Sequence, residues 1–180
     1  MRIYTRRGDT GTTGLYLGGR VSKDADPIEV NGAVDEAQAM LGWARSGCER
    51  GGRLDVLLVS VERDLWVLMA DVGTSAAHRS QLVAGRTMVT EEMVRRLEQE
   101  IDALTSEYPM PREFVVPGDD RVAAALDVAR TVVRRAERVA VGRVDPSSQV
   151  LAYLNRLSDL VWTMARWAEG PEHRTAREEQ

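Results

Sequence analysis

The fold is decided by residues 129–138, Ala129-Arg130-Thr131-Val132-Val133-Arg134-Arg135-Ala136-Glu137-Arg138. They lie in a longer run without Gly or Pro, from Val122 to Val141, in which apolar residues recur at helical spacing. Arg130, Arg134 and Arg138 are four residues apart, so in a helix they stack on one face about 6 Å from one another. Three stacked cations need compensating charge. Solvent, carboxylates of neighbouring helices and a polyphosphate are the three alternatives that the pattern leaves open.

Four other stretches repeat apolar residues at helical spacing and are separated by turn-forming residues. These predicted helices run from Ile28 to about Glu49, from Leu54 to Val72, from Thr90 to the break at Tyr108-Pro109, and from Gln149 to about Glu169. Either Asp119 or Asp120 is expected to cap the arginine helix. Residues 73–89 predict an exposed, mobile loop. The pattern therefore predicts an all-α fold, a five-helix bundle.

The chain length sets the domain layout. A chain of 180 residues is long enough for one domain with its own core. We expect a single domain over residues 1–170, with an irregular Gly/Thr-rich N-terminal arm at 1–27 and the helical bundle at 28–169. Residues 171–180 are charged and predict a disordered tail.

Composition excludes several classes of function. The net charge of -4 does not favour nucleic-acid binding, so the arginine helix is a local concentration of charge. Cys48 is the only cysteine, which excludes an intrachain disulfide and a cysteine-based zinc cluster. His78 and His173 are far apart, which argues against a Ser-His-Asp or histidine-metal site. The sequence has no long apolar segment and no visible targeting peptide, so we expect a soluble cytoplasmic protein without a membrane partner.

The N-terminal arm combines glycine, threonine and basic residues. The set is Gly8, Gly11, Gly14, Gly18 and Gly19, Thr5, Thr10, Thr12 and Thr13, with Arg6, Arg7, Arg20 and Lys23. Glycine lets the backbone approach a ligand closely, and hydroxyls and free N–H groups bind anions. The spacing matches neither a Walker A motif nor a Rossmann loop. A phosphate-binding loop and a flexible arm therefore both remain open.

Two further polar positions flank the predicted core. Asp35 lies close to the buried stripe of its helix, where a carboxylate usually pairs with a cation. Asn155, Ser158 and Asp159 share one face of an otherwise apolar helix. This cluster indicates either a solvated face or a binding site.

Three separated stretches carry a family resemblance. They are Tyr4 to Thr13 with Gly19 to Asp24; Phe114-Val115-Val116-Pro117-Gly118 followed by Ala129-Arg130-Thr131 and Arg134 to Arg138; and Asn155-Arg156-Leu157-Ser158-Asp159. Together they resemble the PduO-type ATP:cob(I)alamin adenosyltransferases, the corrinoid adenosyltransferases of the human mitochondrial type. The resemblance covers about residues 3–168, with order and spacing intact.

The resemblance implies a five-helix bundle that assembles as a homotrimer, with ATP bound between neighbouring subunits. The implied reaction transfers the 5′-deoxyadenosyl group of ATP to reduced cobalamin and releases triphosphate. Mg²⁺ is expected on the ATP phosphates, with no metal held by protein side chains. A cob(II)alamin reductase and a cobalamin-dependent mutase are the implied partners. A noncatalytic ATP sensor or cobalamin carrier of the same fold is the alternative.

The family pattern also implies roles for individual residues. ATP would be bound by Thr5, Arg6, Arg7, Gly8, Thr13, Gly14, Lys23, Arg134, Arg135, Glu137, Arg138 and Asn155. Arg134 and Phe114 would be catalytic, because Arg134 holds phosphate and Phe114 helps displace the lower axial ligand of the corrinoid. Arg130 matches a position that pairs across the subunit interface with the carboxylate matching Asp35.

The sequence departs from the usual family pattern at several positions. Thr10 stands where Lys is common, Pro27 where Arg is frequent, Asp119 in place of a second Gly and Asp127 in place of His. Residues 35–38 read Asp-Glu-Ala-Gln instead of Asp-Glu-Leu-Asn. These departures remove no Arg, Lys or Asn that the pattern makes essential, so they bear on substrate affinity and leave the chemistry in place.

Overall fold

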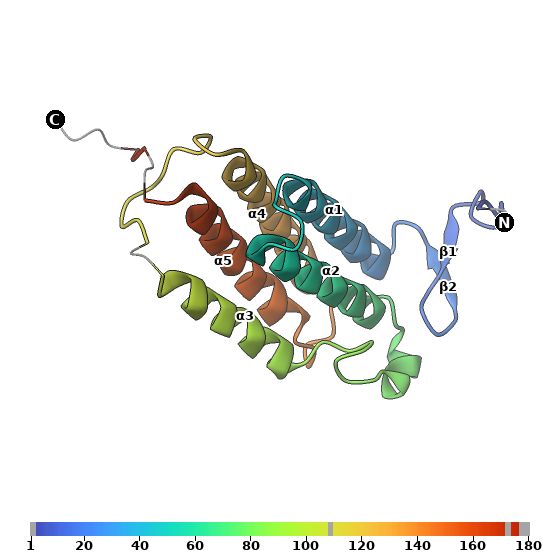
Figure 1. The fold of residues 1–180 in the computed structure, drawn as a ribbon. Helices are drawn as coiled ribbons and strands as arrows, with labels where there is room; N and C mark the ends of the chain where they lie inside the picture. The colour runs from blue at the N-terminus through green and yellow to red at the C-terminus, as the bar shows by residue number, and fades with distance from the viewer. Residues whose placement is uncertain (1–2, 108–109, 172–173, 177–180) are drawn as a thin grey trace.

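The computed structural model describes residues 3–107, 110–171 and 174–176. Within them the chain forms five α-helices, which confirms the predicted helical bundle (Figure 1). The helices are α1 (Asp26–Ser46), α2 (Arg53–Val72), α3 (Glu91–Thr105), α4 (Arg121–Ala140) and α5 (Val150–Glu169). None of the helices in the described part of the chain is long and apolar enough to cross a membrane.

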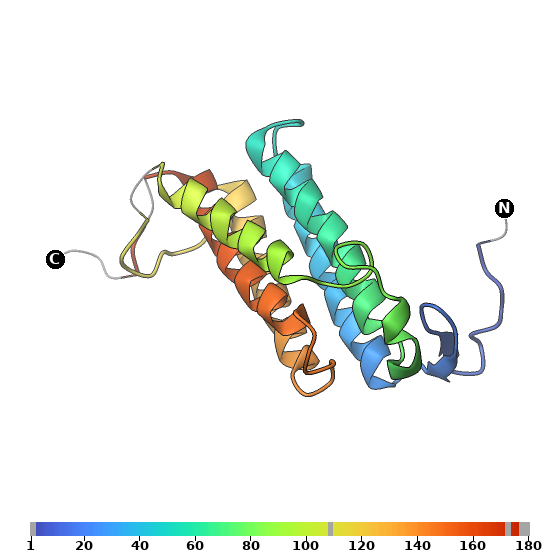
Figure 2. The same cartoon turned by 90° about the horizontal axis from the view of Figure 1, so that it is seen from below.

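Helix α4 lies at the centre of the packing. It packs against α1 and α5, while α3 packs on α5 and α2 packs on α1. Figure 2 shows α1 and α2 together on one side of the bundle and α3, α4 and α5 on the other. The predicted apolar stripe of α4 is buried at Leu126, Ala129, Val133, Ala136 and Ala140. The opposite face of α4 is therefore free to carry the arginines.

A polar contact inside the core joins α5 to α2 and α3. The Tyr153 side chain is 0% exposed, and its hydroxyl donates to Asp64 at 3.0 Å. Arg96 of α3 also donates to Asp64, at 2.6 Å. Burial, followed by the Asp64 charge, raises the pKa of Tyr153 well above its ordinary value of 10.0. The tyrosine therefore stays protonated and satisfies a carboxylate that the apolar core alone would leave unpaired.

The helices begin within two residues of the predicted starts, and α1, α3 and α4 begin at a capping side chain or a proline-containing first turn. Thr90 caps α3 by accepting from the Met93 N–H, and Asp120, not Asp119, caps α4 by accepting from Ala123 at 2.8 Å. Helix α1 begins at Asp26, so Pro27 lies in its first turn, where proline is favoured.

The two nonhelical regions are more structured than the sequence indicates. The arm contains an antiparallel hairpin of β1 (Thr12–Gly14) and β2 (Arg20–Ser22). The loop at residues 73–89 contains a 3-10 helix, η1 (Ala76–Gln81), and ends at the buried Val89. The expectation of an exposed loop is therefore wrong at this end, because buried Asp71 of α2 binds both η1 and Val89.

Candidate functional site

The arginine face of α4 meets the polar face of α5. Arg134 Nη1 lies 3.5 Å from the Ser158 hydroxyl, and the Asn155 side-chain amide donates to Glu137 at 2.9 Å. Ser158 donates to the backbone oxygen of Asn155 at 2.9 Å. The structure thus brings three of the predicted nucleotide-binding residues, Arg134, Glu137 and Asn155, to one place.

The predicted polar cluster of α5 divides between two neighbouring helices. Asn155 and Ser158 face α4, whereas Asp159 accepts from Arg156 at 2.7 Å. Arg156 also donates to Glu98 of α3 at 3.0 Å. The Glu98 carboxylate, and then Asp159, raise the pKa of the Arg156 guanidinium. Asp159 therefore belongs to an α3–α5 contact, and the other half of the cluster lies beside the arginines.

The arginines of the second half of α4 differ in their surroundings. Arg135 forms an ion pair with Glu36 of α1, so its charge is already partly compensated between these helices. Arg134 and Arg138 are exposed and one helical turn apart. Their guanidinium groups present donors that match phosphate oxygens two at a time.

Arg130 and Asp127 occupy the turn of α4 before Arg134. Arg130 lies 3.6 Å from Asp127 on its own helix, and Asp127 accepts from buried Arg166 of α5 at 2.6 Å. From sequence, Asp127 was only a departure from a family pattern, and Arg166 carried no prediction. The available signal was the position of each charged residue on the apolar side of its helix. Asp35 is exposed on α1, and its pairing with Arg130 stays a prediction about neighbouring subunits.

Arg20 gives the arm a defined path. Its Nη2 donates to the backbone oxygens of Arg7 and Thr12 at 2.8 and 3.2 Å, and to the Thr12 hydroxyl at 2.7 Å. Arg20 lies on β2 and Thr12 on β1, so one guanidinium joins the hairpin to the preceding turn. Sequence reasoning gave Arg20 only a share of the positive charge, because the hairpin that places it was not predicted.

The turn before the hairpin gathers most of the predicted arm residues. A Cβ on Gly8 would lie 3.3 Å from the Lys23 ammonium nitrogen, so glycine lets that side chain cross closely. Arg6 has a φ of 62°, a left-handed conformation that residues other than glycine rarely adopt. The Arg7 N–H lies 3.4 Å from the Thr5 hydroxyl. Thr13 and Gly14 follow in β1.

The arm and the α4 cluster lie apart within one chain. Figures 1 and 2 show the hairpin projecting beyond the α1–α2 side of the bundle, whereas α4 and α5 form the other side. The arm joins the bundle where the Tyr16 N–H donates to the Gly73 oxygen at 2.9 Å. The structure of one chain therefore does not bring the two groups of predicted nucleotide-binding residues together.

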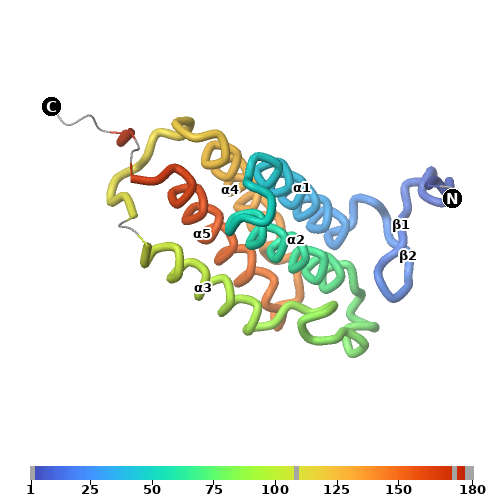
Figure 3. Tube along the Cα trace, in the orientation of Figure 1, coloured from blue at the N-terminus to red at the C-terminus, as the bar shows by residue number. Residues whose placement is uncertain are grey.

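Phe114 precedes the N-terminus of α4, at the end of the helix away from Arg138, and is 88% exposed. It borders a pocket of about 360 Å³ whose lining includes Asp127, Arg130, Trp162 and Arg166. The connection that carries Phe114 runs beside the C-terminal segment (Figure 3), where Val116 donates to the Arg174 oxygen at 2.8 Å. The rest of the expected tail, residues 172–173 and 177–180, lies outside the described residues. Arg130 thus links this pocket to Arg134, one turn further along α4.

Comparison with known proteins identifies the family. The model of the cobalamin adenosyltransferase family matches residues 3–168. The chain belongs to this family. A corrinoid adenosyltransferase of Citrobacter freundii is 39% identical over 171 residues, which cover 93% of this chain and 95% of that protein. A corrinoid adenosyltransferase of Bacillus subtilis (strain 168) is 37% identical over 92% of this chain and 86% of that protein.

Solved structures of the family have the same fold. A variant of the PduO-type ATP:corrinoid adenosyltransferase from Lactobacillus reuteri, complexed with cobalamin and ATP, superposes with a TM-score of 0.81. It is 31% identical in sequence, and the match covers 93% of both chains. A second variant of that enzyme, complexed with ATP, gives a TM-score of 0.80 at 32% identity.

Among the described residues, no group of three or more His, Cys, Asp or Glu side chains could hold a metal ion. The exposed Arg134, Arg138 and Lys23 instead present positive charge.

Proposed function

We propose that this chain transfers the 5′-deoxyadenosyl group of ATP to cob(I)alamin, giving adenosylcobalamin and triphosphate. The observation that carries the proposal is that the arginine face of α4 borders both the pocket beside Phe114 and the polar cluster between α4 and α5. Arg130 lines the pocket beside Phe114. One turn later, Arg134 contacts Ser158, whose hydroxyl donates to the backbone oxygen of Asn155. Its membership of the cobalamin adenosyltransferase family supports the same reaction.

The chemistry requires positioning more than a protein nucleophile. The electron pair of Co(I) attacks the ribose C5′ of ATP, a cobalt–carbon bond forms, and the C5′–O bond breaks. Triphosphate leaves with the bonding pair, and cobalt becomes formally Co(III). Because several negative charges depart together, fixed cations beside the phosphates stabilise the transition state. The protein therefore needs arginines and a shaped pocket.

The nucleotide site is proposed to combine the arm and the second half of α4. Arg134 and Arg138 would bind phosphate oxygens, and Arg135 would do so while Glu36 holds its position. Glu137 accepts from Asn155, and this hydrogen bond would fix both side chains beside the nucleotide. The remaining contacts would come from the arm residues Thr5, Arg6, Arg7, Gly8, Thr13, Gly14 and Lys23.

Phe114 is proposed to act on the corrinoid. An exposed aromatic ring at the edge of a pocket is available to pack against a large, flat ligand. Its apolar surface would exclude the lower axial ligand of cobalt without polar chemistry. Loss of that ligand makes Co(II) easier to reduce, so Phe114 would act at the reduction step.

We propose a homotrimer with ATP at the subunit interfaces. The separation of the arm from the α4 cluster within one chain supports a site shared between copies. Asp35 and Arg130 would form an ion pair across that interface. Mg²⁺ bound to the phosphates would supply further positive charge. A cob(II)alamin reductase, a cobalamin-dependent mutase and a cytoplasmic location stay predictions from the sequence.

One assay tests the proposed reaction. Purified protein is mixed with ATP, Mg²⁺ and chemically reduced cobalamin, and the absorbance change of adenosylcobalamin formation is followed while ATP binding is measured by calorimetry. ATP binding together with the spectral change supports the transferase. ATP binding without it would indicate a nucleotide sensor or cobalamin carrier. Absence of both would refute the proposal.

A further inference from the structure

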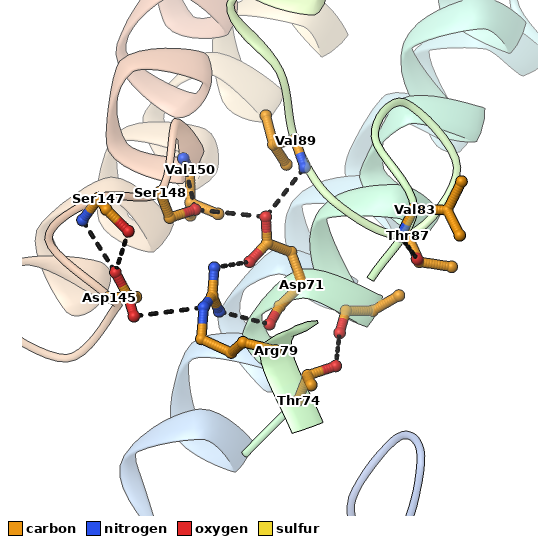
Figure 4. A network of polar contacts seen from close by, with 11 residues as sticks. Asp71, Thr74, Arg79, Val83, Thr87, Val89, Asp145, Ser147, Ser148 and Val150 are labelled. Carbon is orange, nitrogen blue, oxygen red and sulfur yellow. Dashed lines mark hydrogen bonds and ion pairs between the residues drawn. The ribbon is translucent and has the colours of Figure 1, made fainter. Parts of the chain in front are cut away.

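A buried carboxylate at the end of α2 joins four segments of the chain (Figure 4). Asp71 is 1% exposed, and its Oδ1 accepts from Arg79 of η1 at 2.9 Å. Its Oδ2 accepts from the Val89 N–H at 2.9 Å and from the Ser148 hydroxyl at 3.3 Å. The two oxygens thus bind η1, the entry to α3 and the α4–α5 loop from one point on α2.

The same network reaches the first turn of α5. Ser148 accepts from the Val150 N–H at 3.3 Å, and Arg79 Nε lies 3.2 Å from Asp145 in the α4–α5 loop. Asp145 accepts from both the backbone and the hydroxyl of Ser147. The start of α5, which leads to Asn155, is therefore held against α2 through Asp71.

On its other side, this end of α2 holds the arm. The Tyr16 N–H donates to the Gly73 oxygen at 2.9 Å, and Tyr16 forms a β-bridge with Thr74. Space around Gly73 is closed, because a Cβ there would lie 2.9 Å from the Met69 oxygen and 3.0 Å from the Asn31 amide nitrogen. The arm thus docks on Gly73 and Thr74, the second and third residues after Asp71, and close packing around Gly73 keeps this backbone segment in place.

We propose that Asp71 is a positioning residue of the nucleotide site. It fixes the Gly73–Thr74 segment that carries the arm relative to the start of α5, and so sets where the arm residues lie with respect to the bundle. This inference rests on the proposed function, in which ATP contacts both the arm and the α4–α5 cluster. In a symmetric assembly Asp71 has this role whichever copy supplies the arm, because every arm is placed by the Asp71 of its own chain.

The contacts of Asp71 distinguish it from the other buried aspartate of α2. Asp64 binds Arg96 of α3 and Tyr153 of α5, and neither partner leads to the arm. Removal of either charge leaves buried donors unsatisfied and lowers stability. Of the two aspartates, only Asp71 binds η1, which follows shortly after the Gly73–Thr74 segment on which Tyr16 docks, so only its loss should loosen that segment.

The test compares Asp71→Asn with Asp64→Asn as the matched control in the full-length chain. Two readouts are measured: the rate of trypsin cleavage within the arm without nucleotide, and the Kd and KM for ATP beside the KM for cobalamin. For Asp71→Asn we expect faster arm cleavage and an ATP Kd raised about 10-fold or more, with the cobalamin KM changed less than about 3-fold. Asp64→Asn should leave the arm and the ATP Kd close to wild type.

Gly73→Ala is the second variant, for the case that Asp71→Asn does not fold. It changes no charge but forces the docking segment to move, so it should reproduce the faster arm cleavage and the weaker ATP binding. Equal effects of Asp64→Asn and Asp71→Asn, or a Gly73→Ala protein with a wild-type arm and ATP Kd, would overturn the inference. Wild-type protein that does not adenosylate cobalamin would refute the proposed function, while the trypsin comparison would still test the placement of the arm.

Discussion

Replacing Arg134 with alanine separates a catalytic from a structural role of the arginine helix. Arg134 is exposed, and its Nη1 donates to the Ser158 hydroxyl at 3.5 Å, a distance at the upper end of the bonding range. A surface substitution with so weak a contact changes the free energy of unfolding by about 0.5 kcal/mol or less. For a chain of 180 residues, this corresponds to about 1–2 °C in Tm.

The expected effect on catalysis is much larger. A guanidinium that holds departing phosphate oxygens stabilises charge that develops in the transition state. Loss of one such donor lowers kcat by about 100-fold to 1,000-fold, or about 2.7–4 kcal/mol of barrier. We therefore expect Arg134→Ala to fold and assemble like the wild type while losing nearly all adenosylation.

The assay follows adenosylcobalamin formation from reduced cobalamin at saturating ATP and Mg²⁺, with Tm and oligomeric state measured on the same samples. Arg95→Ala is the control, because Arg95 is an exposed arginine of α3 that pairs with Glu92 at 2.7 Å and has no proposed contact with either substrate. Its kcat should stay within about 2-fold of the wild type. A kcat for Arg134→Ala within about 10-fold of the wild type, or a Tm loss as large as that of a core variant, would refute the assignment.

Three further predictions test other parts of the molecule. Phe114→Ala should leave the ATP Kd unchanged but slow turnover from Co(II); weaker ATP binding would contradict its role. Tyr153→Phe removes the hydroxyl bonded to Asp64 and should lower the unfolding free energy by about 1.5–3 kcal/mol in denaturant titrations. Hydrogen bonds from Ser147 hold the pKa of Asp145 below its ordinary 3.8, so its stabilisation is present above that pH and lost as pH falls through the folded value. Asp145→Asn should therefore reduce the fall of Tm on acidification.

Periodicity was sufficient for the bundle, because each helix buries one continuous stripe. The apolar positions predicted for α4 are buried from Leu126 to Ala140. The ends of α2 and α5 are Val72 and Glu169 as predicted, and the other helix boundaries differ from prediction by at most three residues. The hairpin and η1 were missed for a different reason. Their strands and turns are short, and they are fixed by bonds to other segments, such as Arg79 of η1 to Asp71 and Arg20 of β2 to Arg7. Local sequence carries no sign of these partners.

The candidate site was predictable in composition but not in arrangement. Spacing placed Arg134 on a face with Arg138, and the family pattern added Glu137 and Asn155. The structure adds the bond between Glu137 and Asn155. It also directs Arg135 to Glu36, which no helical spacing within α4 could indicate, because the partner lies on another helix. Direction of a side chain at the edge of a helical face depends on what packs beside it.

Arg130 shows how one residue can serve two contacts at the boundary of the site. Its guanidinium lies 3.6 Å from Asp127 and lines the Phe114 pocket, while the sequence predicts an ion pair with Asp35 of a neighbouring copy. These contacts are compatible, because the fork of an arginine presents five N–H donors in fixed directions. Asp127 also accepts from Arg166 at 2.6 Å, so the carboxylate orients two arginines at once. If Arg130 also pairs with Asp35 of a neighbouring copy, a shift of its guanidinium would disturb Asp127 and Arg166, which line the same pocket, whereas Arg134, one turn further on, contacts Ser158 of α5.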